Sequence, residues 1–323
     1  MNSIIGHEQI QRQFKKAIEN KHISHGYIFE GSNGLGKKLM AYHLAQILCC
    51  EKQQTEACGQ CDACVQIETH NSPDILLIKP DGNSLKREQI DDIQKELMVK
   101  PFGHRKIIII EDADLMTTQA QNTFLKTLEE PPSYAVIIML VANSHRLLPT
   151  ILSRSQVIPF YPLHKEVIVS HLQNQYGLDT HQAEVIANYS GGIIGKAIKN
   201  CEDLSFQELR KETIDLLEGV IGGELSKVFL MTQFFEKKKE QINDIIEVVH
   251  LWVRDIMVLK ATGSYDQIVN RDYQSLLYTQ TQRVSLEGIR EAVTAVETFQ
   301  EDLRYNVNYL AAVDQLLFKI QEV

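Results

Sequence analysis

A glycine-rich loop between a short apolar run and a helical pattern constrains the fold of this chain more than any other feature. The apolar run is Tyr27-Ile28-Phe29, and the loop after it extends from Gly31 to Lys38 with the sequence GSNGLGKK. Apolar residues then recur at helical spacing from Leu39 to Leu48. Strand, glycine loop and helix in this order are the context of a phosphate-binding P-loop, whose backbone N–H groups surround phosphate oxygens. The loop therefore predicts an α/β fold with a nucleotide site.

The loop departs from the P-loop pattern G-x-x-x-x-G-K-[ST] at its last position. Gly31, Gly36 and Lys37 match, and Gly34 is a further candidate for nucleotide contact, but Lys38 replaces the metal-binding hydroxyl. An ammonium group cannot ligate Mg²⁺ and repels it. We expect that ATP or ADP can bind, that Mg²⁺ binds poorly, and that hydrolysis is inefficient without the metal's stabilisation of the transition state. The alternative is a surface glycine turn before a helix.

A second apolar run supplies the acidic partner that a P-loop needs. Residues 106–110, KIIII, are typical of a parallel strand that is buried on both faces, and Glu111-Asp112 follows directly. P-loop enzymes place a metal-binding aspartate at such a strand end, although the order of the two acids here is unusual. A helix from about Thr118 to Leu128 and a buried strand over Ala135–Ala142 come next. The alternation predicts a parallel α/β sheet within residues 1–160.

Beyond Pro162 the strand patterns end and helical periodicity takes over. Residues 163–200 contain two or three short helical patterns with a break at Gly191-Gly192, and the sequence is helical throughout from about Thr213. Three apolar stripes lie in this last part: Ile242, Ile245, Ile246, Val249, Val253 and Ile256; Leu286, Ile289, Val293, Val296 and Phe299; Val307, Leu310, Val313, Leu317 and Ile320. We predict an α/β domain over 1–162, a small helical domain over 163–212 and an all-α domain over 213–323.

Charge disfavours a protein that wraps nucleic acid, so any DNA contact must be local or shared with partners, and hydropathy disfavours a protein that spans a membrane. The net charge of -9 is no electrostatic footprint for wrapping nucleic acid. No apolar run approaches the ~20 residues of a membrane span, and the N-terminal sequence MNSIIGHEQI lacks a signal-peptide pattern. We therefore expect a cytoplasmic protein without a membrane partner, whose cysteines are metal ligands or core residues and not disulfides.

A cluster of cysteines follows the predicted P-loop helix. Cys58, Cys61 and Cys64 are each separated by two residues, and Cys49-Cys50 lies at the end of the helix. Four thiolates of this kind can surround one tetrahedral zinc ion, which would be structural because no ligand position stays open. The alternatives are a redox C-x-x-C, whose thioredoxin-like context is missing, or scattered buried thiols. The spacing leaves Cys49 and Cys50 both open as the fourth ligand.

Several segments together resemble the clamp-loader branch of the AAA+ proteins. Residues 4–8, IIGHE, are similar to its N-terminal signature, and residues 122–132, NTFLKTLEEPP, are close to its most recognisable string. Leu152-Ser153-Arg154-Ser155 resembles the branch's Ser-Arg-Cys motif, with serine in place of cysteine. The resemblance is close over residues 1–200 and looser to Val323. It implies an AAA+ P-loop domain with a zinc module, then a helical lid and a helical collar that joins subunits.

The resemblance also implies a division of labour between subunits. The tau/gamma motor of this branch has threonine at the position of Lys38, Asp-Glu at that of Glu111-Asp112, and an arginine, the sensor-2 residue, at that of Gly195. Three ATPase elements are therefore weakened here, whereas Asn143 keeps a polar residue at the sensor-1 position. We expect weak or no ATPase activity from the chain alone.

In place of its own hydrolysis, such a subunit lends an arginine to a neighbour. The resemblance assigns this arginine-finger role to Arg154, beside Ser153, and implies the delta and tau/gamma clamp-loader subunits as partners. Through the complex, the partners include the sliding clamp and primed DNA. For the zinc site, alignment from the glycine loop favours Cys50, whereas the family's eight-residue gap from Cys58 leads back to Cys49; we prefer Cys50.

Two other functions remain open at this point. One is an active clamp-loader ATPase of the tau/gamma type, and the other is a zinc-containing nucleic-acid-binding module that uses the P-loop fold as a scaffold. The acidic net charge disfavours the second.

Overall fold

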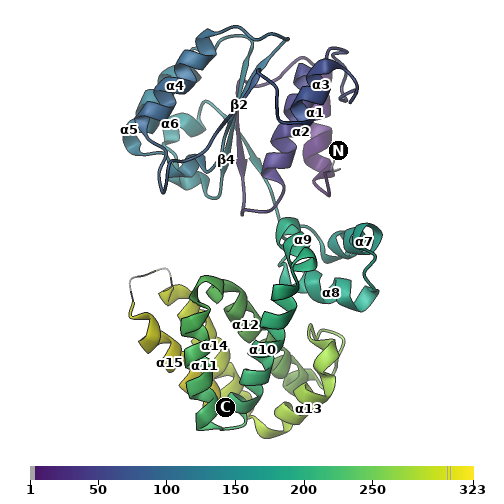
Figure 1. Ribbon diagram of the computed structural model, residues 1–323, viewed down its shortest axis with the longest axis vertical. Helices are drawn as coiled ribbons and strands as arrows, with labels where there is room; N and C mark the ends of the chain where they lie inside the picture. The colour runs from purple at the N-terminus through teal and green to yellow at the C-terminus, as the bar shows by residue number, and fades with distance from the viewer. Residues whose placement is uncertain (1–3, 304, 306) are drawn as a thin grey trace. The chain divides into compact units, whose positions relative to one another are not determined.

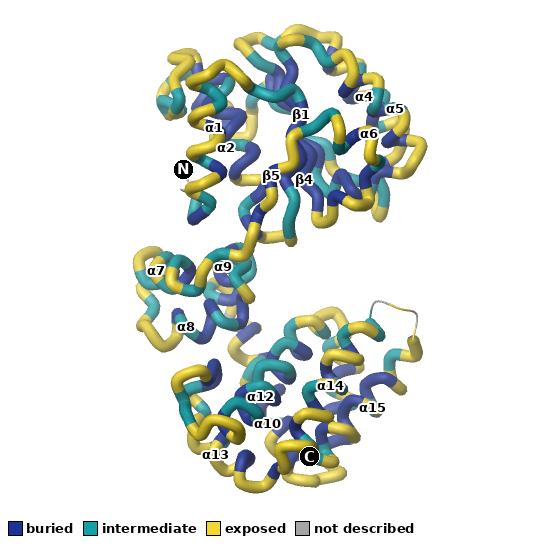
Figure 2. The backbone as a smooth tube through the Cα atoms, turned by 180° about the vertical axis from the view of Figure 1, so that it is seen from behind, coloured by how far each residue is buried: buried dark blue, intermediate teal, exposed yellow. Residues whose placement is uncertain are grey.

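A five-stranded parallel sheet organises the N-terminal part of the chain (Figure 1). Its strands are β1 (Gly26–Glu30), β2 (Ile75–Ile78), β3 (Lys106–Ile110), β4 (Ala135–Val141) and β5 (Gln156–Pro159), in the order β2-β3-β4-β1-β5. The computed structural model describes residues 4–303, 305 and 307–323. β3 and β4 are buried along their whole length, as their continuous apolar sequences predicted (Figure 2).

Helices cover both faces of this sheet (Figure 1). On one face lie α1 (Glu8–Glu19), α2 (Lys37–Cys49) and α3 (Asp62–Glu68); on the other lie α4 (Arg87–Met98), α5 (Thr118–Glu129) and α6 (Pro149–Leu152). Successive strand residues point to opposite faces, so Ile107 and Ile109 join the core under α2, and Ile108 and Ile110 join the core under α4 and α5. Short 3-10 turns, η1 (Ala113–Leu115) and η2 (Ser144–Arg146), follow β3 and β4.

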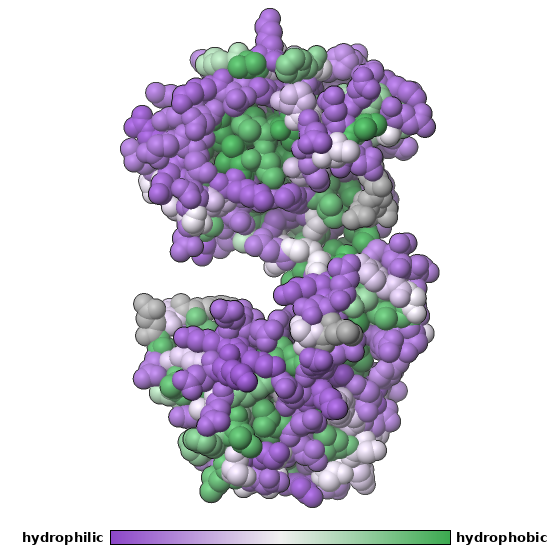
Figure 3. Space-filling model, viewed as in Figure 1, coloured by the Kyte–Doolittle hydropathy of each residue, from purple (hydrophilic) through white to green (hydrophobic). Residues whose placement is uncertain are grey.

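The edge strands β2 and β5 were not predicted from the sequence, and neither were the helices α3 and α4. The four apolar residues of β2 are only partly buried, and Figure 3 shows an apolar hollow on this unit where Figure 1, in the same view, places β2. In β5 only Ile158 is buried, and the strand ends in a proline that an edge position tolerates. An edge strand has one free side, so its sequence lacks the continuous apolar signal of a central strand.

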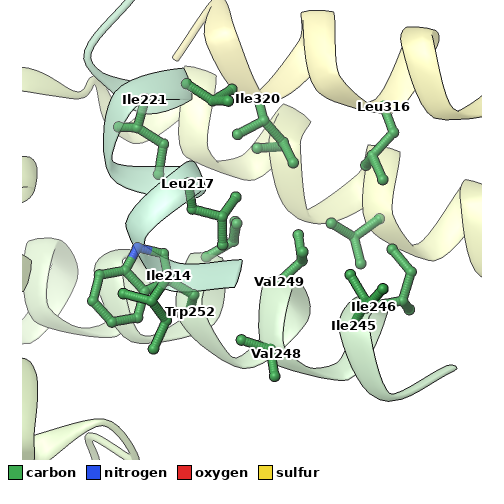
Figure 4. Close-up of a cluster of buried hydrophobic side chains, with 14 of the residues drawn as sticks. Ile214, Leu217, Ile221, Ile245, Ile246, Val248, Val249, Trp252, Leu316 and Ile320 are labelled. Atoms are coloured by element: carbon green, nitrogen blue, oxygen red, sulfur yellow. The ribbon is translucent and has the colours of Figure 1, made fainter. Parts of the chain in front are cut away.

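The rest of the described chain is helical. It contains α7 (Lys165–Tyr176), α8 (Thr180–Tyr189), α9 (Ile194–Glu202), α10 (Leu204–Ile221), α11 (Leu225–Lys237), α12 (Ile242–Thr262), α13 (Gln274–Arg283), α14 (Leu286–Asp302) and α15 (Tyr309–Gln321), with 3-10 turns η3 (Lys239–Gln241) and η4 (Arg271–Tyr273). α12 is the centre of one large core, where Trp252 packs beside Ile214 and Val249 (Figure 4). No helix of the described residues is long and apolar enough to cross a membrane.

The predicted fold class is confirmed in its architecture: an α/β domain with a parallel sheet, a glycine loop after β1 and a four-cysteine module, followed by helical regions. The chain forms two compact units, Met1–Val167 with Gly192–Lys196, and Ile168–Gly191 with Ala197–Val323. The predicted division into 1–162, 163–212 and 213–323 stays a prediction. The third apolar stripe is partly wrong: Val307 precedes α15 and Leu310 lies on its outer face, so both are exposed, whereas Ala312 and Leu316 are buried.

Candidate nucleotide loop, arginine and cysteine cluster

The glycine loop leaves the carboxyl end of β1, and α2 begins directly after it at Lys37. Lys37 is 6% exposed and is turned into the loop, where its ammonium donates to the carbonyl of Gly31, to the carbonyl of Ser32 at 3.2 Å and to Asn33 Oδ1 at 3.4 Å. Burial lowers the pKa of Lys37, and the nearby carboxylates of Asp112 and Asp114 partly oppose that shift. A phosphate group would have to draw this lysine away from the loop carbonyls.

The residue in the place of the metal-binding hydroxyl makes an ion pair with the acidic strand end. Lys38 Nζ lies 2.6 Å from Glu111 Oε1, and Lys79 Nζ lies 4.0 Å from the other oxygen of the same carboxylate. Asp112, the next residue, has a left-handed backbone with φ 46° and begins the η1 turn. A protein ammonium therefore neutralises the carboxylate next to the loop, where Mg²⁺ would need unpaired oxygen ligands.

A second segment of the first unit closes on the loop from the side. The N–H of Gly195 donates to the carbonyl of Gly34 at 2.9 Å. A β-carbon on Gly195 would lie 2.9 Å from that carbonyl oxygen, and one on Gly34 would lie 2.8 Å from Ile193 Cγ2. Side chains are therefore excluded from both positions by backbone and core packing. The position to which the resemblance assigned an arginine in the motor is occupied by the only residue type that allows this contact.

Asn143 follows β4, but its side chain serves its own turn. Its Oδ1 accepts a hydrogen bond from the N–H of His145 at 2.9 Å and so caps η2, and the residue is exposed. The neighbouring Ser144 N–H donates to Glu30 Oε1 at 2.8 Å, which ties η2 to the end of β1. The predicted site residues thus gather at the carboxyl end of the strands: Gly31, Gly34, Gly36, Lys37, Lys38, Glu111 and Asp112. Asn143 lies at the same end, after β4, and its side-chain oxygen is already hydrogen-bonded.

Arg154 lies at the other end of the strands, where β1 and β5 begin. Ser153 and Arg154 connect α6 to β5, beside the start of β1: a β-carbon on Gly26 would lie 3.4 Å from the Arg154 carbonyl oxygen. The guanidinium makes an ion pair with Glu129 at the end of α5, with 3.0 Å between Nη2 and Oε1. Its Nη1 donates to the carbonyl of Thr150 at 3.0 Å and to Ser153 Oγ at 3.3 Å.

A surface pocket of about 610 Å³ contains this ion pair. It is lined by Ser24, His25, Leu128, Glu129, Ser153, Arg154, Ser155 and Gln156. Two of its polar atoms, His25 Nε2 and Ser155 Oγ, are buried and have no hydrogen-bond partner in the described part of the chain. The pocket therefore combines one cation with polar groups that still have hydrogen-bonding capacity.

Four cysteines converge between the end of α2 and the start of α3. The Sγ atoms of Cys50, Cys58, Cys61 and Cys64 all lie within 4.8 Å of one another, so the cluster could hold a metal ion. Cys58 and Cys64 Sγ are 3.9 Å apart. Four sulfurs bound to one tetrahedral zinc at ~2.3 Å lie about 3.8 Å from each other, so this spacing fits zinc.

Backbone N–H groups favour the thiolate form of Cys58, whereas burial raises the pKa of Cys64. The N–H of Cys58 points at Cys50 Sγ (3.5 Å) and the N–H of Cys61 at Cys58 Sγ (3.4 Å). Hydrogen bonds from the N–H groups of Gln60 and Cys61 lower the pKa of Cys58 to about 6. Cys49 differs: burial raises its pKa to about 12, and its Sγ faces the Arg105 carbonyl at 3.6 Å. Cys49 is therefore a protonated core residue that lies outside the cluster.

Two residues of these sites were not predicted. Lys79 lies at the end of β2, a strand that the sequence did not reveal, so nothing indicated that it would reach Glu111. Glu129 belongs to the NTFLKTLEEPP string that supported the family resemblance, but no local pattern indicated its pairing with Arg154. The contact forms because the end of α5 lies beside the segment that leads into β5, and the sequence does not reveal that these two segments are neighbours.

Comparison with known proteins identifies relatives for almost the whole chain. A sequence family described as DNA polymerase III, delta subunit, matches residues 6–164, and one described as DNA polymerase III, delta subunit, C terminal, matches residues 206–322. The chain is 31% identical to DNA polymerase III subunit delta' of Bacillus subtilis, over 97% of this chain and 96% of that protein. It is 26% identical to the tau subunit of the same species, over 92% of this chain and 53% of tau.

One solved structure aligns with almost the whole chain at low identity. A gamma subunit-related DNA polymerase III protein from Thermotoga maritima aligns over 97% of this chain and 98% of that chain, with 20% identity and a TM-score of 0.45. The identification rests on the sequence relatives, and above all on the full-length match to delta'. The chain belongs to the DNA polymerase III delta' family.

Proposed function

We propose that the chain is the delta' subunit of a bacterial DNA polymerase III clamp-loader complex and supplies Arg154 as an arginine finger to the ATP of a neighbouring subunit. In this role it helps to load the sliding clamp onto primed DNA during replication. Its partners are the delta and tau/gamma subunits, and its contacts with the clamp and DNA are made through the complex. The observation that carries the proposal is the separation of Arg154 from the chain's own glycine loop.

The geometry of β1 supports action in trans. Arg154 lies beside Gly26 at the start of this five-residue strand, and the glycine loop follows Glu30 at its end. At about 3.3 Å per residue, the strand separates the two sites by roughly 13 Å. The guanidinium also points to α5, toward Glu129. Arg154 is therefore available to a phosphate on another subunit and not to one in its own loop.

The chemistry of the finger is electrostatic. As a neighbour's γ-phosphate is transferred to water, negative charge spreads over its equatorial oxygens, and a planar guanidinium can bind two of them at once. Such an arginine contributes about 10³–10⁵ in rate in related nucleotide hydrolases. Ser153, whose hydroxyl accepts a hydrogen bond from Arg154, helps to position it.

The chain's own loop has a lesser role. The internal Lys38–Glu111 ion pair supports weak, largely Mg²⁺-independent binding of ATP or ADP through Gly31, Gly34, Gly36 and Lys37, and little or no hydrolysis. Within the polymerase holoenzyme the chain is then a structural and activating subunit. Zinc, held by Cys50, Cys58, Cys61 and Cys64, stabilises the module after α2 and takes no part in catalysis.

Reconstitution with delta and tau/gamma subunits and a sliding clamp tests the finger. Arg154→Ala is expected to leave assembly intact by size-exclusion chromatography and to lower ATP turnover at the site it serves by about 10³ or more. Clamp loading on primed DNA falls with it. Arg154→Lys keeps the charge but loses the planar fork, so it is expected to remain defective.

Arg87→Ala is the matched control, since Arg87 is a surface arginine of α4 paired only locally with Asp91. Normal ATPase activity and clamp loading by the assembled Arg154→Ala complex would rule out the finger. ATP hydrolysis by the isolated chain with Mg²⁺, abolished by Lys37→Ala, would favour a tau/gamma-type motor instead.

A further inference from the structure

The ion pair between Arg154 and Glu129 places a competitor beside the finger. The two side chains are 35% and 50% exposed, and their charged atoms are 3.0 Å apart. Glu129 is the last residue of α5 and shares the guanidinium with the Thr150 carbonyl and the Ser153 hydroxyl; all but Thr150 are lining residues of the pocket. A γ-phosphate that approaches Arg154 must therefore displace this carboxylate or share the guanidinium with it.

We propose that Glu129 is an autoinhibitory contact that restrains Arg154 until a neighbour's nucleotide displaces it. This inference rests on the proposed finger role and adds its regulation. A carboxylate and a phosphate compete for the same planar donors, and the phosphate wins because it carries more charge and more acceptor oxygens. After displacement, the Glu129 carboxylate still lies near the phosphate and repels the negative charge that develops on it. Glu129 therefore disfavours both the contact of Arg154 with the phosphate and the transition state of hydrolysis.

The pocket contains polar groups near which the guanidinium could lie after it leaves Glu129. His25 and Ser155 are among its lining residues, and their Nε2 and Oγ atoms are buried without a hydrogen-bond partner among the described residues. They can accept or donate hydrogen bonds when a phosphate and its water enter beside Arg154. The resting contact with Glu129 is thus one of two arrangements that the pocket offers to the arginine.

The size of the effect follows from exposure. Ion pairs between partly exposed side chains are weak and are screened by salt. The restraint is therefore expected to lower the rate of ATP turnover by only a few-fold. Glu129→Gln in the reconstituted complex is expected to raise ATP turnover at limiting ATP by about two- to fivefold at low salt. The gain should shrink at 0.5 M salt, whereas a change caused by altered folding would persist there.

Glu130→Gln is the matched control. It removes the same charge one residue further on, and Glu130 makes no ion pair within the described part of the chain. It is expected to leave the rate unchanged. The double variant Glu129→Gln/Arg154→Ala is expected to behave as Arg154→Ala alone, because the restraint acts only through the arginine.

The outcomes separate the two proposals. If Arg154→Ala impairs the complex but Glu129→Gln matches Glu130→Gln or lowers turnover, the finger stands and the restraint is wrong. A gain from Glu129→Gln that persists in the Arg154→Ala background also overturns the restraint. If Arg154→Ala itself has no effect, the proposed function fails, and the restraint fails with it.

Discussion

Lys38 illustrates how one side chain can redirect the chemistry of an intact loop. The glycine loop after β1 and Lys37 at the start of α2 have the arrangement predicted for a phosphate site. The ammonium of Lys38 satisfies Glu111 at 2.6 Å, so the carboxylate that should organise a metal already has a permanent cation. We therefore expect position 38 to control whether Mg²⁺ contributes to nucleotide binding.

Lys38→Thr tests this assignment. The substitution supplies a hydroxyl ligand and frees Glu111, so nucleotide affinity should become Mg²⁺-dependent, by about tenfold, whereas affinity in the wild-type chain should change little with Mg²⁺. Calorimetric titration of ADP with and without Mg²⁺ measures both values. Lys79→Thr, which removes the more distant lysine at 4.0 Å, is the control and should not create the dependence. Equal Mg²⁺ dependence in the wild type and Lys38→Thr would contradict the assignment.

The sequence predicted residue types at these sites but not their partners. Lys38 departs from the P-loop pattern and Arg154 matches the Ser-Arg-Cys motif, and both patterns can be recognised from the sequence alone. The contacts of Glu111 with Lys79 and of Arg154 with Glu129 join segments far apart in the chain. They depend on which strand lies beside which, and local periodicity contains no information about strand order.

The cysteine module is expected to depend less on the hydrophobic core than the sheet does. It lies between α2 and α3, and its short connecting segment contains few large apolar residues. Metal ligation can replace a core in so small a structure, because a structural zinc ion contributes folding free energy directly. The module should therefore lose order when the metal is removed, while the sheet stays folded.

Two adjacent cysteines provide an internal comparison. Cys50→Ser should abolish stoichiometric zinc binding, since Cys50 Sγ belongs to the cluster. Cys49→Ser should keep the zinc, because Cys49 faces the Arg105 carbonyl. Elemental analysis of the purified variants gives the zinc content, and hydrogen exchange over residues 50–70 reports the expected local unfolding. The reverse pattern would make Cys49 the fourth ligand.

Central and edge elements differed in how well the sequence predicted them. The helix predicted over Thr118–Leu128 ends at Glu129, and the strand predicted over Ala135–Ala142 ends at Val141. β2 and β5 were missed because each has four residues and neither is fully buried. Short, half-exposed strands have a weak apolar pattern in the sequence, whereas long buried strands are recognised by their continuous apolar residues.

At the scale of the whole molecule, the chain has two units with separate cores. The first unit packs apolar side chains against both faces of its sheet, and the second surrounds α12 with helices. Units with their own cores can unfold in separate transitions. Stability should therefore be a property of each unit, and a core substitution should affect only the unit that contains it.

Trp252→Ala tests this independence. Trp252 is fully buried and donates to Gln280 Oε1 at 2.9 Å, so its loss should cost the second unit about 3–5 kcal/mol and lower its melting temperature by roughly 6–20 °C. The transition of the first unit and its zinc content should not change. Phe229→Ala, at an exposed aromatic of α11, is the control and should leave both transitions in place. A single shifted transition would show that the units unfold together.

The contact of Gly195 with Gly34 should make the proposed inactivity of the loop hard to reverse. A threonine at position 38 would return one metal ligand, but an arginine at position 195 would collide with the backbone of the loop that it is meant to serve. Restoring turnover therefore requires remodelling the main chain of the 193–195 segment before any catalytic side chain can be added. We therefore expect that neither a threonine at position 38 nor an arginine at position 195 restores turnover by itself.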